Sequence, residues 1–332
     1  MGIGRLLSYT DAGAPQLQGT AGSLAAVLKA ALVDGYGSVA PLGWTLEYSA
    51  DDYKQIAFRN NPVTGTGFYF RITDNLSDSR YADFSAYESM TGIDTYLNPI
   101  LLTETKPFWV CKSYYSTSQS TAVPWHIVGD DRGFWISNNI YAQYPTSYTY
   151  KPVWGGLYIG DINPATVAYP YGFCLCSAGW YGSESYSKTP APTYTLLQTG
   201  AVDSNWCVKL MRDISGIPGA VKARLGASTV SSDISGPYIG HSNIGPVNGV
   251  LYCTSPVFLV STDSNTFPST LYGTLPGYYD CAAKTGVIID AVSSIVVDGD
   301  TTLLFLPGMP HNNTANSGLE CIYAGPGWRD DI

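Results

Sequence analysis

A chain of 332 residues with 45% apolar side chains is long enough for one large or two ordinary domains with a sizeable core. Charged residues make up only 13%, about half the usual share, and the net charge is −9. The basic residues are scattered, which argues against a nucleic-acid partner. The sequence contains no run of about 18 apolar residues, so we predict no membrane-spanning helix.

The N-terminal segment divides into an arm and a helix. Residues 1–19 are polar and contain Gly and Pro, and we expect them to form a flexible arm that becomes ordered on a partner subunit. A short helix follows, with Thr20 as its expected N-cap and Gly35 as the residue that ends it. Apolar residues recur there at helical spacing, at Leu24, Val27, Leu28, Ala31 and Leu32. This apolar stripe must pack on a sheet.

From Gly43 onward the chain has the pattern of β-strands separated by turns rich in Gly and Pro. Asp298-Gly299 is a strong signal for a tight hairpin turn. We expect strands at 44–49, 54–59, 67–73, 81–87, 108–115, 156–159, 171–176, 221–225, 250–254, 257–260, 286–292, 294–297 and 301–306. The sequence therefore predicts a mainly β fold, an antiparallel sandwich or barrel-like core of hairpins with one short N-terminal α-helix.

The domain organisation predicted by these patterns is simple. After the arm of residues 1–19, residues 20–332 form a single β-rich domain. The segment 181–195 is rich in Ser, Thr and Pro and has few aliphatic residues, which indicates a long loop or a subdomain join. The seven cysteines are odd in number and widely spaced, so we expect reduced thiols in a chain made in a reducing cytoplasm.

Residues 125–136 are the first candidate reaction centre. Two apolar strands flank the turn Gly-Asp-Asp-Arg-Gly, and His126 precedes Asp130 and Asp131. On a strand with a rise of about 3.3 Å per residue, the turn lies roughly 13 Å from His126, so a His–Asp dyad would require the turn to fold back. We interpret the segment as a structural hairpin whose acidic turn satisfies its own backbone and pairs with Arg132.

The other candidate motifs are incomplete. Residues 240–244 depart from a nucleophile elbow at Ile244, and Ser185 and Lys188 fit Ser-x-x-Lys in a loop with no helix. The three histidines lack metal-binding spacing, and residues 19–23 lack the glycine pattern of a phosphate loop. We predict no catalytic residue, no metal and no cofactor. Two facing carboxylates, as in a glycan hydrolase, are the enzyme alternative that the sequence leaves open.

Six segments in chain order together resemble a family of tailed-bacteriophage virion structural proteins. They are residues 9–37 followed by Gly43-Trp44, Phe68–Arg71, Tyr87–Thr95, Pro124-Trp125 leading into Gly129–Arg132 and the aromatic pair Phe134-Trp135, Gly156–Asp161, and Leu271–Gly277. The resemblance covers most of the chain, although Tyr272 stands where the family usually has Arg. It implies a non-enzymatic structural component of the virion, made in the host bacterial cytoplasm. We favour a position in the tail or neck over capsid decoration.

A protein of this kind acts through contacts with copies of itself and with other virion proteins. Its 26 tyrosines, with few charges, suit such contact surfaces. The contact residues we expect are Tyr9, Pro15 and Leu17 in the arm and Tyr181 and Tyr186 in the long loop. The alternative is a β-rich host-receptor or carbohydrate-binding module of the virion, with a host surface glycan as partner. Exposed aromatic residues gathered in one cleft would indicate that alternative.

Overall fold

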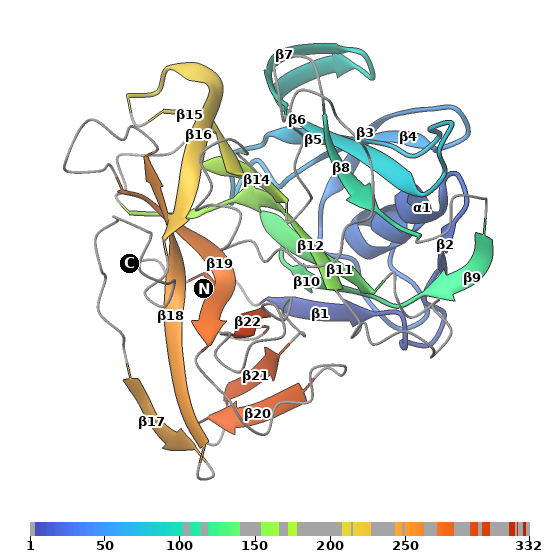
Figure 1. The fold of residues 1–332 in the computed structure, drawn as a ribbon. Coiled ribbons are helices and arrows are strands. Elements are labelled where there is room, and N and C mark those ends of the chain that lie inside the picture. Colours follow the sequence, from blue (N-terminus) through green and yellow to red (C-terminus); the bar gives the residue numbers. More distant parts are fainter. Residues whose placement is uncertain are drawn as a thin grey trace.

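The computed structural model describes residues 4–101, 107–113, 119–139, 154–165, 172–177, 208–213, 215–226, 243–247, 250–261, 271–281, 293–297, 301–305, 319–322, 324 and 328–329. These residues form antiparallel sheets and one short helical segment, so the predicted fold class is confirmed (Figure 1). Neither of the two large sheets closes into a barrel within the described part of the chain, and the arrangement is that of a sandwich.

The smaller of the two large sheets has six strands. In spatial order they are β3 (Thr45–Ala50), β4 (Gln55–Arg59), β5 (Tyr69–Thr73), β6 (Tyr81–Gly92) and β7 (Thr95–Ile100), with β8 (Phe108–Cys111) also paired to β6. The register aligns Phe58 with Phe70 and Ile72 with Phe84. Because successive side chains alternate between faces, this register collects the large apolar residues on one face of the sheet.

The larger sheet has twelve strands. Its main path is β1 (Arg5–Ser8), β10 (Trp125–Gly129), β11 (Gly133–Asn139), β12 (Trp154–Asp161), β14 (Phe173–Ser177), β15 (Val208–Arg212), β16 (Pro218–Gly226), β18 (Val250–Ser261), β19 (Leu271–Cys281) and β13 (Asn163–Pro164). Off this path, β17 (Asn243–Val247) pairs with β18 and β22 (Leu319–Ile322) with β19. Two smaller sheets join β2 (Leu17–Gly19) to β9 (Gln119–Val123) and β20 (Ser293–Val297) to β21 (Thr301–Phe305). The strands flanking Asp298-Gly299 therefore pair as predicted, whereas the expected strand 286–292 lies outside the described residues.

The predicted helix is confirmed, but its start differs from the prediction. Helix α1 (Ser23–Lys29) continues as one π-helical turn, η1 (Ala30–Asp34). Its N-cap is Gly22 in the left-handed region (φ 81°) rather than Thr20, and Gly35 (φ 77°) ends η1 as expected. The carboxylate of Asp74 accepts the backbone N–H groups of Leu24 and Ala25 at 2.8 and 3.1 Å. A carboxylate about 50 residues further along the chain thus replaces the side-chain cap that the local sequence lacks.

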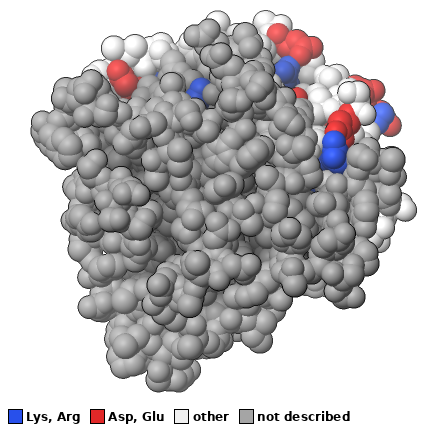
Figure 2. All heavy atoms as spheres, viewed as in Figure 1, with Lys and Arg blue, Asp and Glu red and all other residues white. Residues whose placement is uncertain are grey.

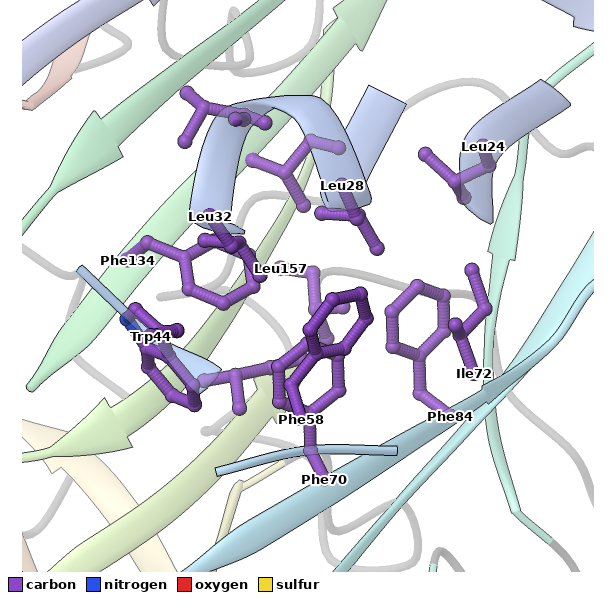
Figure 3. Close-up of a cluster of buried hydrophobic side chains, with 14 of the residues drawn as sticks. Leu24, Leu28, Leu32, Trp44, Phe58, Phe70, Ile72, Phe84, Phe134 and Leu157 are labelled. Carbon is purple, nitrogen blue, oxygen red and sulfur yellow. The ribbon is translucent and has the colours of Figure 1, made fainter. Parts of the chain in front are cut away.

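One hydrophobic core unites the helix with both large sheets. Leu24, Leu28 and Leu32 lie on the side of the helix that faces the rings of Phe58 and Phe70 (Figure 3). Strands of the larger sheet add apolar residues to the same cluster, among them Ile127, Phe134, Leu157, Ile159, Phe173 and Leu175. The helix stripe is fully buried, so it packs on sheet residues as its spacing predicts.

The N-terminal arm is part of this fold. Strand β1 pairs with β10, aligning Leu7 with Ile127, and β2 pairs with β9. Leu17 is 0% exposed and belongs to the core. The expectation of a free arm is therefore wrong for the described residues 4–19, because Leu7 and Leu17 are buried and the backbone of β1 and β2 pairs with strands of this chain. The predicted join near 181–195 lies outside the described residues.

Candidate functional site

The hairpin 125–136 forms as the sequence predicts. Strands β10 and β11 are antiparallel and align Gly129 with Phe134 and Trp125 with Asn138. The side chains of Trp125, Phe134 and Trp135 are completely buried. The turn between the strands, residues 130–132, is thereby held at the edge of the core, where its charged side chains have to find partners.

Asp130 is the centre of a buried polar cluster at this turn. Its Oδ1 accepts the backbone N–H groups of Arg132 and Gly133, each at 2.9 Å. Arg329 binds both oxygens of the same carboxylate, Nε to Oδ2 at 2.6 Å and Nη2 to Oδ1 at 3.0 Å. A third nitrogen of Arg329, Nη1, donates to the carbonyl of Asp161 at 2.6 Å. The Tyr158 hydroxyl donates to the same carbonyl. We call Asp130, Arg132, Gly133, Tyr158, Asp161 and Arg329 the tip cluster.

Asp161 at the end of β12 is the second carboxylate of the tip cluster. Its Oδ1 accepts from Asn60 at 2.9 Å and from the Thr66 hydroxyl at 2.7 Å. Its Oδ2 accepts the Thr66 backbone N–H at 2.9 Å and pairs with Arg132 at 3.4 Å. Burial raises the pKa of Asp161, and the nearby Arg329 acts in the opposite direction. The prediction that the turn satisfies its own backbone is confirmed, but the pairing of Arg132 with its own turn is wrong, because Asp161 from the next strand is its partner.

Asp131 connects the turn to the loop between β4 and β5. Its Oδ2 accepts from Asn61 Nδ2 at 2.7 Å and from the Thr64 hydroxyl at 2.9 Å. Its backbone carbonyl accepts the N–H of Asn61 at 2.9 Å. The side chain is half-buried, so these contacts lie at the rim of the fold, outside the buried ion pair.

His126 lies apart from the acids of the turn. It aligns with Ser8 of β1, and its ring lies 5.6 Å from the ring of Tyr9, edge to face. Burial lowers the pKa of His126 to about 4, and the charge of Asp11 only partly offsets this. The imidazole is therefore neutral at neutral pH and contacts the N-terminal strand. This arrangement agrees with the interpretation of the hairpin as structural.

A reactive role would need carboxylate oxygens open to a substrate. The oxygens of Asp130 and Asp161 accept hydrogen bonds or ion pairs from within the chain, and both side chains are buried. Among the described residues, no group of three His, Cys, Asp or Glu side chains could hold a metal ion. None of the helices in the described part of the chain is long and apolar enough to cross a bilayer.

Two of the weaker motifs can be placed in the structure. Asn243 and Ile244 begin strand β17, which pairs with β18, so residues 240–244 do not lead into a helix as a nucleophile elbow would. The helix start after residues 19–23 already holds an anion, the carboxylate of Asp74. The motif Ser185–Lys188 lies outside the described residues.

The predicted contact residues have different positions in the fold. Tyr9 is 45% exposed, whereas Pro15 is half-buried and its carbonyl accepts the indole N–H of Trp125 at 3.0 Å. Leu17 is wrong as a contact residue, because it is enclosed in the core of its own chain. Tyr181 and Tyr186 lie outside the described residues.

Sequence reasoning did not foresee that Arg71 holds the hairpin of β6 and β7, which belongs to the six-stranded sheet. Arg71 Nη1 donates to the carbonyl of Ile93 at 2.9 Å and to Asp94 at 2.7 Å. The guanidinium also lies 5.6 Å from the ring centre of Tyr87 and 5.9 Å from that of Tyr96. These contacts fix the hairpin and leave Tyr96 partly exposed.

Several charges on the described surface form ion pairs. Figure 2 shows acidic and basic groups next to each other on the face that it draws, in the part that is not grey. The pairs Arg71–Asp94, Arg80–Asp78 and Lys29–Asp34 are examples.

No protein-family model matches this chain, and no curated protein matches its sequence closely enough to indicate a relationship.

Proposed function

We propose that this chain is a non-enzymatic structural component of a tailed bacteriophage particle, acting through contacts with copies of itself and with other virion proteins. The observation that carries the proposal is how the fold uses the segments that resemble that family. The segments Phe68–Arg71 and Tyr87–Thr95 meet where Arg71 binds Ile93 and Asp94. These residues act as a structural frame.

The later segments meet in the same manner. Gly129–Arg132 contacts Gly156–Asp161 through the ion pair of Arg132 with Asp161. The indole N–H of Trp135 donates to the carbonyl of Pro276, in the segment Leu271–Gly277, at 2.9 Å. The residues that carry the resemblance thus hold strands together in the interior, which supports a structural rather than a catalytic role.

The enzyme alternative has less support from the same contacts. A glycan hydrolase needs two carboxylates that face a sugar across an open groove. In the tip cluster, Asp130 and Asp161 are buried and bind Arg329, Arg132 and backbone groups. Their positions suit ion pairs that hold the hairpin, and a substrate would have to displace them.

The carbohydrate-binding alternative depends on where exposed aromatic side chains lie. In the described part of the chain, the exposed ones are Tyr9, Tyr53 and Tyr96. They lie after β1, in the turn between β3 and β4, and in β7, so they do not form one stacking platform. Most other described aromatic residues are buried. This distribution supports the structural role over a sugar-binding cleft.

The experiment that tests the proposal starts from purified particles of the phage that encodes this chain. Mass spectrometry should find the chain in the particles, and negative-stain labelling of a tagged copy should place it at the tail or neck. Absence of the chain from intact particles would contradict the proposal. Binding on a glycan array by a chain that is present in the particles would favour the receptor-binding alternative instead.

A further inference from the structure

Trp328 and Arg329 are docked on a region that is far away in sequence. Arg329 lies 199 positions after Asp130 and is 1% exposed. Three nitrogens of its guanidinium bind the Asp130 carboxylate and the Asp161 carbonyl. The segment therefore supplies the positive charge of the tip cluster that lies against Asp130.

Two glycines make room for this segment. A Cβ at Gly133 would lie 2.7 Å from Arg329 Nη2 and 2.4 Å from the Tyr158 hydroxyl. A Cβ at Gly4 would lie 2.6 Å from the indole ring of Trp328. All three distances are too short for real atoms, so Trp328 and Arg329 lie directly against backbone that carries no side chain.

Because Trp328 lies against Gly4, the contacts of residues 328–329 also reach the N-terminal strand. Gly4 immediately precedes β1, and β1 is the edge of the larger sheet, paired with β10 of the hairpin. Trp328 thus covers the start of β1, and Arg329 neutralises the turn of the hairpin on which β1 pairs. Without Arg329, the buried Asp130 carboxylate would keep only the backbone donors of its own turn, and an uncompensated buried charge is costly.

We infer that Trp328-Arg329 is a clasp that closes the tip cluster together with β1, so that these three parts of the chain open and close as one unit. A chain that has been synthesised as far as Asp161 carries the Asp130 carboxylate but lacks Arg329, the partner of that carboxylate. Its hairpin turn stays hydrated and open until residues 328–329 are present and dock. The clasp thereby makes closure of the hairpin turn and of β1 conditional on a distant segment.

The first test uses the full wild-type chain at low denaturant concentrations. Trypsin can cut after Arg329 only when the clasp is open, and mass spectrometry detects the trimmed product. Hydrogen exchange reports opening of the Gly133 and Asp161 amides, whose partners lie in the tip cluster, and of the β1 amides. We expect tryptic cleavage at Arg329 and hydrogen exchange of these amides to report the same free energy of opening, with the same dependence on denaturant concentration. Cutting at Arg329 while these amides stay protected would overturn the inference.

The second test uses variants of the full chain. Arg329→Met should raise the opening constants of the β1, Gly133 and Asp161 amides on the order of a hundredfold, the effect of breaking a buried pair. Adding Asp130→Asn to Arg329→Met should recover part of this loss, because no charge is then left buried. The control is Arg80→Met, which removes a partly exposed pair with Asp78 and should leave the tip cluster unchanged. Equal effects of Arg329→Met and Arg80→Met would contradict a clasp.

Discussion

Lys112 and Asp74 form an ion pair in which neither side chain has any exposed surface. The same Asp74 carboxylate accepts the first free N–H groups of helix α1, and Lys112 also donates to the carbonyl of Thr20 at 2.5 Å. Burial raises the pKa of Asp74 and lowers the pKa of Lys112, while their mutual attraction opposes both shifts. One buried pair therefore fixes the start of the helix to the strands beneath it.

Removing one member of this pair should be severe. Lys112→Met leaves the Asp74 carboxylate buried without a counter-charge, and we expect the free energy of unfolding to fall by about 3–5 kcal/mol. Equilibrium denaturation measures the change. The double variant with Asp74→Asn should be less affected than Lys112→Met alone, since an amide oxygen can still accept from Leu24 and Ala25. A double variant as unstable as the single one would refute the pairing argument.

The buried His126 gives a dependence of stability on pH. Its pKa is about 4 in the folded state against 6.5 for the ordinary group, so the unfolded state takes up the proton first. The contribution of His126 to the free energy of unfolding is constant above pH 6.5 and is lost as the pH falls toward 4. Between pH 7 and pH 5 the loss should be about 2 kcal/mol, from about 1.4 kcal/mol per pH unit.

The measurement for His126 is a difference between two chains. Denaturation of the wild type and of His126→Gln is measured at pH 7 and at pH 5. Subtracting the two chains' changes in stability cancels the contributions of other titrating groups, which both chains share. The wild type should lose more stability than His126→Gln over this interval. The same pH dependence in both chains would show that His126 is not the group responsible.

Trp125 joins the hairpin to the N-terminal segment. Its ring is completely buried, its indole N–H donates to the Pro15 carbonyl, and it contacts the ring of Tyr36 edge to face. Trp125→Ala should lower the free energy of unfolding by about 3–5 kcal/mol and expose residues 9–19 to proteases. Trp125→Phe, which keeps most of the apolar volume, is the control. Unchanged proteolysis of residues 9–19 in Trp125→Ala would argue against this connection.

The two acids of the turn should respond differently to the same substitution. Asp131→Asn keeps an oxygen that can accept from Asn61 and Thr64 at the rim, so we expect a change below about 1 kcal/mol. Asp130→Asn leaves Arg329 buried without its carboxylate and should cost about 3 kcal/mol or more. Thermal denaturation of both variants checks this order, and the reverse order would contradict the assignment of the tip cluster.

Tyr9 is the predicted contact residue that the fold leaves exposed. If it contacts another virion protein, Tyr9→Ser should lower incorporation into particles by roughly tenfold, the effect of losing about 1.4 kcal/mol of binding. Stability of the free chain should change little. Tyr53→Ser, which changes a similarly exposed tyrosine in the turn between β3 and β4, is the matched control. Normal incorporation of the Tyr9→Ser chain would remove Tyr9 from the contact surface.

The sequence by itself determined the helix with its apolar face and many of the strands, although it missed β1 and β2 in the expected arm. The helical spacing of Leu24, Leu28 and Leu32 and the alternation along the strands depend only on local geometry, which the chain carries residue by residue. The distance along the strand likewise separates His126 from the acids of the turn before any tertiary contact is considered.

Only the tertiary structure decided which charges meet. Nothing near Asp130 in sequence indicates Arg329, and nothing near the helix start indicates Asp74 or Lys112. The sequence alone places Leu17 in a free arm, whereas the structure buries it. The two differ because burial depends on which distant strand covers a residue. Ion pairs and burial are set by how the two sheets pack on the helix, and local periodicity carries no information about partners so far away in the chain.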